Sequence, residues 1–316
     1  MNLNAAAFKQ LCNRIEQNIN RIMIGKSEVI EYLLIALAAG GHVLIEDVPG
    51  IGKTTLVSAL AKTLDLSFKR IQFTPDLMPS DVTGFSLYNQ KTMEFEFQPG
   101  AVMAQLILAD EINRTSPKTQ SALLEVMQEQ QVTVDGITYP LPQPFLVMAT
   151  QNPVEHLGTY PLPEAQLDRF MLKINLGYPT VDEEVRIMHL YREANPLAYL
   201  QAVAEAKDIL WMREQARLVH CADAVKRYIA MLTSATRQLP AVELGASPRA
   251  SMMLMQAAKG RALLQGRDYV RPDDVQALAV ATLAHRITLS PESKLKRVSE
   301  ENCIYQVLER VPVPER

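Results

Sequence analysis

The sequence is poor in cysteine and has no excess of charge of either sign. Its 316 residues include three cysteines, Cys12, Cys221 and Cys303, which lie far apart and form no CxxC pair. An odd number of dispersed cysteines fits neither a disulfide framework nor a zinc site, so we expect a reducing compartment. The 32 basic and 35 acidic residues give a net charge of −3. Nucleic acid is therefore disfavoured as a partner, although a local basic stripe stays open.

Long hydrophobic runs are also absent. The longest apolar stretch, from Tyr32 to Ile45, has 14 residues and is interrupted by Gly40 and Gly41. A helix that spans a bilayer needs about 20 apolar residues, so we expect no membrane span. The start of the sequence, MNLNAAAFKQ, has neither the basic segment nor the apolar core of a secretory signal. These features together predict a cytoplasmic protein.

The composition itself is that of a globular protein. Hydrophobic residues make up 48% and charged residues 21% of the chain, which is typical of soluble domains and not of disordered, collagenous or coiled-coil chains. At about 150 residues per domain, the length predicts roughly two domains. A chain of this length buries a sizeable core.

The first half alternates short apolar runs with helical patterns. A strand in a parallel sheet is covered on both faces and is apolar along most of its length, and helices cross between such strands. Helices are expected over Thr54–Leu64 and over Pro117–Gln130, the second with Ser116 as its N-cap. Five runs qualify as strands: His42–Asp47, Phe68–Thr74, Gln105–Asp110, Phe145–Gln151 and Phe170–Leu176. The pattern predicts an α/β fold with a parallel sheet.

Two segments interrupt this alternation and are expected to form hairpins. Apolar residues alternate on both arms of Gly84–Gly100, with a polar turn between the arms. In Gln131–Tyr139, two short β-prone arms flank Asp135-Gly136, a dipeptide suited to a two-residue type I′ turn. Both hairpins are expected to project from the sheet.

The second half shows helical periodicity and no strand pattern. We expect an α/β domain over residues 1–179 and an all-helical domain over residues 180–316. The boundary follows Tyr178-Pro179, where the strand pattern ends. The expected helices are Asp182–Arg192, Ala222–Gln238, Ser247–Gln265 and Pro272–Arg286.

The strongest functional signal is the segment DVPGIGKT at residues 47–54, which follows a predicted strand and opens a predicted helix. This is the arrangement of a phosphate-binding P-loop, in which backbone N–H groups contact phosphate oxygens. Lys53 is expected to reach the β- and γ-phosphates and the Thr54 hydroxyl to bind magnesium. The pattern departs from the usual one at Asp47, where a glycine is common. Gly50 and Gly52, which allow close backbone approach, are retained.

Two further predicted strands end in polar residues at the same edge of the sheet. The apolar strand LILAD is followed by an acid, which places Asp110 and Glu111 where α/β folds bind ligands. Asp110 is expected to hold magnesium, and Glu111 to orient the attacking water. Asn152, at the end of another strand, either contacts the γ-phosphate or the water, or caps the turn before Pro153.

In combination and in order, these motifs resemble the MoxR family of AAA+ ATPases. The resemblance covers nearly the whole chain. It implies a five-stranded sheet of order 5-1-4-3-2 and a C-terminal helical lid. It also implies a hairpin inserted in the second helix and a second hairpin before the strand that leads to Asn152. The segments that carry it are residues 41–54, 73–81, 110–114, 149–153 and 166–170.

The resemblance also implies roles for individual residues. Asn152 matches sensor 1, and Arg169 matches an arginine finger that reaches the nucleotide of a neighbouring subunit. Arg249 matches sensor 2 on the lid. An arginine in the first turn of a helix is disfavoured by the helix dipole unless an anion is near, which also favours a γ-phosphate contact. A solvated pairing with an acid such as Glu243 remains the alternative. For Arg114, a structural role between subunits is as plausible as a catalytic one.

The implied nucleotide site comprises the P-loop and a segment near the adenine. The expected nucleotide-binding residues are Ile24, Gly25, Pro49, Gly50, Ile51, Gly52, Lys53, Thr54 and Thr55. ATP and Mg²⁺ are the expected cofactors, bound between the sheet edge and the lid. Thr54 and Asp110 are the expected metal ligands.

The implied activity is ATP hydrolysis by a chaperone or motor that acts as a homo-oligomer, with a hexameric ring expected. The expected partners are a protein with a von Willebrand factor A domain and a protein client that is remodelled or matured. Three alternatives stay open: the motor subunit of a metal chelatase, a DNA-remodelling ATPase, and a nucleotide-gated scaffold that does not hydrolyse ATP. Glu111 argues against the scaffold.

Overall fold

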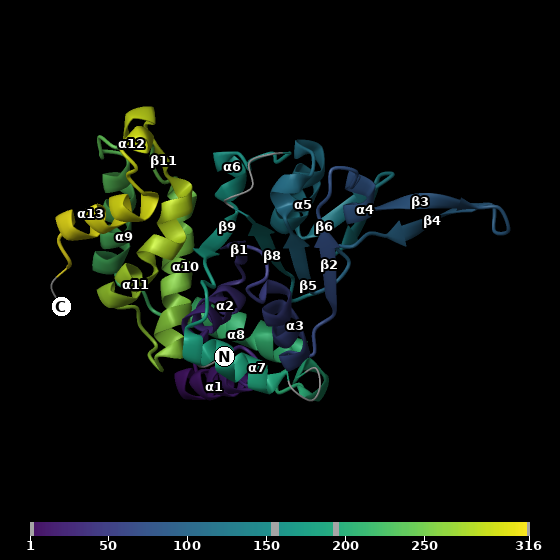
Figure 1. Cartoon of the computed structure of the whole chain (residues 1–316), viewed down its shortest axis with the longest axis horizontal. Coiled ribbons are helices and arrows are strands. Elements are labelled where there is room, and N and C mark those ends of the chain that lie inside the picture. The colour runs from purple at the N-terminus through teal and green to yellow at the C-terminus, as the bar shows by residue number, and fades with distance from the viewer. Residues whose placement is uncertain (1–2, 153–157, 192–195, 315–316) are drawn as a thin grey trace.

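We describe the protein from a computed structural model, which covers residues 3–152, 158–191 and 196–314. A parallel sheet lies at the centre, with a long hairpin projecting on one side and a group of C-terminal helices on the other (Figure 1). Among the described residues, no helix is long and apolar enough to cross a membrane.

The central sheet has five strands in the order β2-β5-β8-β1-β9. All four neighbouring pairs are parallel. Numbered along the chain, the order reads 2-3-4-1-5, which confirms the expected 5-1-4-3-2 read from the other edge. The strands are β1 (His42–Glu46), β2 (Phe68–Gln72), β5 (Leu106–Asp110), β8 (Leu146–Gln151) and β9 (Phe170–Ile174).

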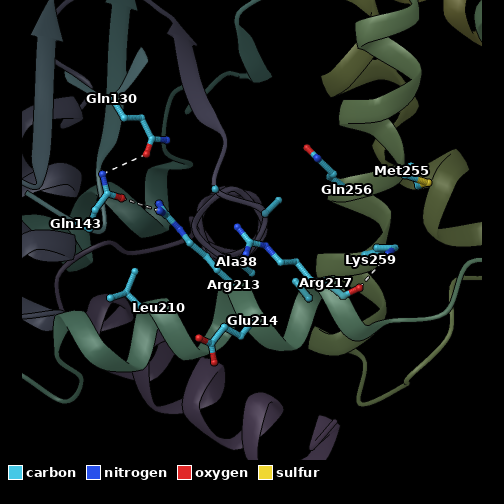
Figure 2. Close-up of a pocket in the computed structure, with 13 residues that line it drawn as sticks. Ala38, Gln130, Gln143, Leu210, Arg213, Glu214, Arg217, Met255, Gln256 and Lys259 are labelled. Carbon is cyan, nitrogen blue, oxygen red and sulfur yellow. Dashed lines mark hydrogen bonds between the residues drawn. The ribbon is translucent and has the colours of Figure 1, made fainter. Parts of the chain in front are cut away.

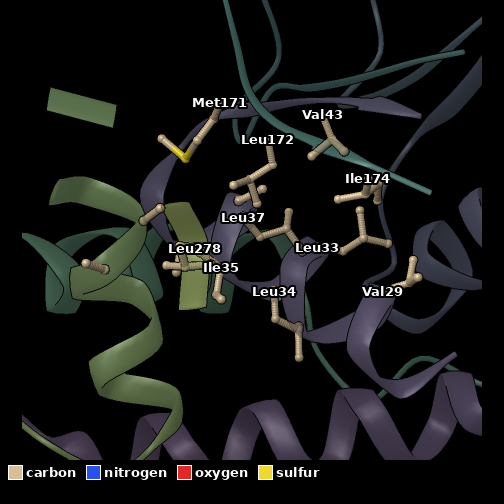
Figure 3. Close-up of a cluster of buried hydrophobic side chains, with 14 of the residues drawn as sticks. Val29, Leu33, Leu34, Ile35, Leu37, Val43, Met171, Leu172, Ile174 and Leu278 are labelled. Carbon is tan, nitrogen blue, oxygen red and sulfur yellow. The ribbon is translucent and has the colours of Figure 1, made fainter. Parts of the chain in front are cut away.

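In the three central strands β5, β8 and β1, alternate apolar residues enter two different cores. In β1, Val43 and Ile45 belong to one apolar cluster, and Leu44 belongs to the other. The first cluster is covered by helices that include α1 (Ala5–Asn20), α2 (Ser27–Ala39) and α3 (Lys53–Thr63), and Figure 3 shows side chains of α2 packed against those of β1 and β9. The second lies under α5 (Pro117–Glu129). This two-sided burial explains why these three strands are mostly apolar, whereas the edge strand β2 carries exposed polar residues.

Both predicted hairpins are present. The longer one has arms β3 (Gly84–Asn89) and β4 (Glu94–Pro99) and follows the short helix α4 (Pro79–Thr83), which the sequence pattern did not predict. The shorter one has arms β6 (Gln131–Val134) and β7 (Ile137–Pro140), with Asp135 and Gly136 in the turn at positive φ. Phe97 and Tyr139 stack with ring centroids 4.0 Å apart, so the two hairpins meet at their bases.

The C-terminal part is mainly helical, as expected, but it contains a small antiparallel pair, β10 (Val242–Leu244) and β11 (Thr288–Leu289). The expectation of an all-helical domain was wrong in this detail. The remaining α-helices are α6 (Glu164–Leu167), α7 (Val181–Leu190), α8 (Ala206–Leu218), α9 (Asp223–Thr236), α10 (Pro248–Leu264), α11 (Pro272–Leu283), α12 (Pro291–Leu295) and α13 (Glu300–Arg310). Three short 3₁₀ helices are η1 (Ile112–Arg114), η2 (Pro196–Tyr199) and η3 (Ala284–Arg286).

One apolar cluster joins the two halves of the chain. α8 packs against α2, and α10 packs against α1, α2 and β9. The cluster that covers one face of the sheet therefore continues into the C-terminal helices. The predicted boundary at residues 179 and 180 stays a prediction. The last residue of the predicted helix Asp182–Arg192 lies outside the described residues.

Candidate functional site

The P-loop connects the end of β1 to the start of α3, as its sequence indicates. Gly50 and Gly52 have φ of 87° and 93°, in the region that favours glycine. An added Cβ at Gly50 would meet no atom within 4 Å, so space is left open above the loop. α3 begins at Lys53 and has no side chain capping its first turn. Its first backbone N–H groups are therefore available to an anion, and the loop fits a nucleotide phosphate.

Lys53 points back toward the start of its own loop. Its Nζ donates a hydrogen bond of 2.9 Å to the main-chain oxygen of Asp47. Thr54, the next residue, is partly exposed at the start of α3. Both residues thus lie in the first turn of α3, where the Thr54 hydroxyl would hold a magnesium ion and Lys53 would contact the phosphates.

Asp110, at the end of β5, is buried and held from two sides. Its Oδ1 accepts a 2.6 Å hydrogen bond from the Thr150 hydroxyl, and its Oδ2 accepts a 2.6 Å hydrogen bond from Nη2 of Arg70. Arg70 comes from the edge strand β2 and was not identified from the sequence. The arginine places a positive charge beside the Asp110 carboxylate.

Glu111 directly follows Asp110 and adopts a left-handed conformation with φ of 56°. Its backbone N–H donates to the Thr150 hydroxyl at 2.8 Å. Its Oε2 accepts hydrogen bonds from Gln72 Nε2 at 2.8 Å and from Arg114 Nη1 at 3.1 Å. Thr150 therefore aligns both acids, and Gln72 and Arg114 hold the second one.

Asn152 lies just beyond the end of β8, the strand between β5 and β1. Because the sheet is parallel, Asn152, Glu111 and the P-loop share one edge. Asn152 is 7% exposed. The structure thus brings together the residues predicted from three separate strands, while the specific contact of Asn152 with a phosphate stays a prediction.

A cavity of about 480 Å³ lies beside the P-loop. One wall comes from the segment between α1 and α2, including Ile24, and another comes from the P-loop. The third wall, which sequence reasoning missed, is formed by Tyr178, Pro179 and α7, with Ile187, Met188 and Tyr191. The cavity has a mainly apolar lining next to a phosphate-binding loop, which fits a nucleoside attached to phosphates. Among the predicted binding residues, Ile24, Pro49, Gly50, Ile51, Gly52 and Thr55 line it.

Gly25 is covered by α7. An ideal Cβ at Gly25 would lie 1.8 Å from Oε1 of Glu183, and Gly25 has φ of 72°. The positive φ favours glycine at this position, and the carboxylate of Glu183 in the first turn of α7 lies directly against it. Hydrogen bonding to Thr180 lowers the pKa of Glu183, with a smaller contribution from the charge of Lys26.

Arg249 lies away from this chain's own P-loop. It occupies the first turn of α10, whose N-cap Ser247 accepts a hydrogen bond from Ala250 N, and its Nη2 donates to Gln128 Oε1 at 3.5 Å. The residue before Gln128, Met127, is hydrogen-bonded to His42, the first residue of β1. Arg249 is therefore at the edge where β1 begins, and the P-loop is at the edge where β1 ends.

The expectation that nucleotide binds between the sheet edge and the domain of residues 180–316 stays a prediction. The part of that domain that closes the cavity is α7. Arg169 directly precedes β9, which runs parallel to β1, so it also lies at the starting edge of the strands. Its guanidinium donates to the main-chain oxygen of Leu124. Both arginines are remote from the nucleotide cavity of their own chain, and their catalytic roles stay predictions.

A second cavity, of about 510 Å³, lies at this opposite edge (Figure 2). Arg213 and Arg217 extend from α8 toward the end of α2, and Lys259 faces them from α10. Arg213 donates to the main-chain oxygens of Leu37 and Phe145. Burial, with the nearby Arg217, lowers the pKa of the Arg213 guanidinium to about 10. Because the Arg213 guanidinium is already bound by backbone carbonyls, we interpret this cavity as a gap where α8, α2 and α10 meet, and not as a ligand site.

Comparison with known proteins agrees with this geometry. Residues 42–172 match the family model of the ATPases associated with various cellular activities (AAA), and residues 234–304 match the AAA lid domain. The chain is 44% identical over 306 residues to Chaperone MoxR1 of Mycobacterium tuberculosis, covering 94% of this chain and 81% of the relative. It is 31% identical to Protein MoxR of Methylorubrum extorquens, covering 97% and 96% of the two chains.

The chain belongs to the MoxR family of AAA+ ATPases. It is also 54% identical to the uncharacterised protein YeaC of Bacillus subtilis, covering 96% of this chain and 95% of that one. The crystal structure of a candidate ATPase from Cytophaga hutchinsonii superimposes with a TM-score of 0.92 at 42% identity, covering 98% and 97% of the chains. As a MoxR-type AAA+ protein, the chain binds nucleotide and is an ATPase.

Proposed function

We propose that this MoxR-family ATPase is a chaperone that uses Mg²⁺ and ATP to remodel or mature a protein client. The main support for this proposal is that the P-loop and the two acids Asp110 and Glu111 lie at the same edge of the sheet. A cavity of nucleoside size lies beside them. The P-loop accounts for nucleotide binding but not for hydrolysis. Glu111, whose backbone N–H is held by the Thr150 hydroxyl, supports hydrolysis.

Each residue of the site has a distinct task in this proposal. Lys53 binds the phosphates, and Thr54 with Asp110 holds the magnesium ion, either directly or through water. When bound, that ion supplies positive charge that stabilises the transferring phosphoryl group. Glu111 accepts a hydrogen bond from the attacking water and orients it. Arg70 and Gln72 keep the two carboxylates in position before the nucleotide arrives.

The site is completed by a neighbouring subunit in a ring, for which we propose six copies. Arg169 and Arg249 are both at the starting edge of the strands, remote from their own chain's P-loop. This placement supports a role at the nucleotide of the adjacent subunit. An arginine supplied in this way contributes about 10³- to 10⁵-fold to turnover in phosphoryl-transfer enzymes.

The long hairpin supports a protein as client or partner. On the hairpin that projects from the sheet (Figure 1), Met93 in the turn is 71% exposed and Phe95 on β4 is 73% exposed. Exposed apolar side chains on a projecting element mark a protein-binding surface. One relative is named a chaperone. We propose a von Willebrand factor A domain protein as the partner, and the cytoplasm as a compartment that fits the three unpaired, buried cysteines.

The substitution Glu111→Gln tests hydrolysis separately from binding. The amide keeps the size of the side chain but cannot accept a proton, so ATP turnover should fall about 10²-fold or more. The affinity for ATP, measured by equilibrium binding, should stay within about threefold because Lys53 and the P-loop are intact.

Glu125→Gln on the exposed side of α5 is the matched control and should hydrolyse ATP at the wild-type rate. Unchanged hydrolysis by the Glu111→Gln protein would remove Glu111 from its assigned role. Failure of the wild-type protein to bind ATP would remove the proposed function itself.

A further inference from the structure

Asp47 makes contacts that a glycine at the same position could not make. Its main-chain oxygen accepts the hydrogen bond from Lys53, and its main-chain N–H donates to Gln151 at 3.2 Å. Its carboxylate Oδ2 accepts hydrogen bonds from the backbone N–H groups of Leu176 and Gly177, the second at 3.2 Å. The first pair of contacts needs only a backbone. The second pair requires the carboxylate and ties the P-loop to the segment between β9 and α7.

Lys26 holds the same two residues from the other side. It is 9% exposed. Its Nζ donates to the main-chain oxygens of Leu176 at 2.7 Å and Gly177 at 3.1 Å. The N–H and C=O groups of both residues are thus bound by two side chains of opposite charge, from two other segments. Hydrogen bonds to charged groups are about twice as strong as neutral ones.

The segment held in this way leads directly into the third wall of the nucleotide cavity. Tyr178 and Pro179 line the cavity, and α7 follows from Val181. Gly177 has φ of 65°, a conformation that glycine adopts without strain and where the chain can turn. Fixing residues 176 and 177 therefore fixes the direction in which α7 leaves the sheet. The contact of Glu183 with Gly25 shows how closely that helix is seated.

We propose that Asp47 and Lys26 form a latch that seats α7 over the bound nucleoside and couples this wall to the P-loop lysine. The proposal rests on the proposed nucleotide site. The coupling to Lys53 runs through the main chain of Asp47, whose oxygen accepts the hydrogen bond from Lys53 Nζ. Asp47 is a positioning residue: it acts on the nucleotide through residues 176–191 and not by touching it.

The substitution Asp47→Gly tests the latch, because glycine is the residue that a P-loop usually has at this position. The loop backbone should tolerate it, while both carboxylate contacts are lost. We expect binding of a fluorescent ADP analogue to weaken about tenfold, the change that corresponds to one hydrogen bond to a charged group. In steady-state hydrolysis, KM for ATP should rise by more than kcat falls, since the reacting groups are unchanged. Amide hydrogen exchange over residues 176–191 should speed up.

Asp65→Gly is the matched control. Asp65 is exposed in the turn after α3 with φ of 49°, so the same chemical change is made outside the latch. It should alter neither ADP binding nor exchange over residues 176–191. Lys26→Met removes the other half of the latch, and exchange over the same residues should increase in this variant too. In the double variant the effects on exchange should be less than additive, because both side chains hold the same two peptide groups.

Wild-type ADP affinity together with wild-type exchange over residues 176–191 in the Asp47→Gly protein would overturn the latch. That result would leave the proposed function intact. Loss of ADP binding in the wild-type protein would instead overturn the nucleotide site on which the latch rests.

Discussion

His42 is a buried histidine that the nucleotide site does not use. It starts β1, and its ring nitrogens contact the Met127 oxygen and the Val147 N–H, each at 3.0 Å. Since Val147 donates to Nδ1, the proton of the neutral ring lies on Nε2. Burial lowers the pKa of His42 to about 4. The Nε2 contact links the sheet to α5, and the Nδ1 contact with Val147 requires the neutral ring because a protonated Nδ1 cannot accept a hydrogen bond.

This gives a pH dependence of stability. Between about pH 6.5 and pH 4 the unfolded chain binds a proton at His42 that the folded chain does not. The free energy of unfolding should fall as the pH falls through this range, with about 3 kcal/mol attributable to His42. Urea unfolding at a series of pH values measures it.

His42→Gln keeps one donor and one acceptor and cannot titrate, so its stability profile should be flatter. His285, whose pKa burial also lowers, stays in both proteins and contributes with the same sign. Identical pH profiles for the two proteins would show that His42 does not carry the effect.

The residues of the site differ in how far the sequence could locate them. Lys53, Asp110 and Glu111 were identified because their strand and helix contexts are local in sequence. Arg70 and Gln72 were missed because their function depends on β2 lying next to β5, which is a property of sheet order. Arg249 was assigned to the correct helix turn, but its place relative to the P-loop depends on how α10 packs.

At the scale of elements, hydrophobic period and turn chemistry predicted the five strands and both hairpins well. α8 was not predicted, although its buried residues Ile209, Met212 and Ala216 have the spacing of an amphipathic helix. α7 was predicted as a helix, yet none of its residues is buried. Its role as a cavity wall arises from the turn at Gly177 and is not visible in its own sequence.

A buried ion pair joins the start of β9 to the lid elements. Arg286 in η3 donates to Asp168 Oδ1 at 2.8 Å, and Ser247, the N-cap of α10, donates to Asp168 Oδ2 at 2.9 Å. Burial lowers the pKa of Arg286 to about 10 even though the charge of Asp168 raises it. Asp168 thus holds η3 and α10 of the lid against the start of β9. Because Asp168 directly precedes Arg169, the same contacts also hold the backbone of the predicted arginine finger.

Asp168→Asn should therefore destabilise the fold by about 3 to 5 kcal/mol, because it leaves the buried guanidinium without its counter-charge. Chemical unfolding measures the change. Asp223→Asn breaks an exposed pair with Lys226 and should cost at most about 1 kcal/mol. Equal effects of the two substitutions would show that the buried pair does not tie β9 to the lid.

At the scale of the whole molecule, one chain contains the phosphate-binding loop, the acids and the nucleoside cavity at one edge of the sheet. The two arginines with predicted catalytic roles lie at the other edge. A single chain therefore cannot bring all of these groups to one nucleotide without a large rearrangement. Assembly of copies, with one chain's starting edge near the next chain's P-loop, brings them together.

Mixing two inactive variants tests whether the catalytic site is shared between subunits. Neither Arg169→Ala nor Lys53→Ala protein should hydrolyse ATP efficiently when assembled alone. In a random equal mixture, about a quarter of the interfaces join an intact Lys53 to an intact Arg169. ATP turnover should therefore reappear on mixing, in proportion to those interfaces. Absence of any recovery, although native mass spectrometry shows mixed rings, would contradict a site shared between subunits.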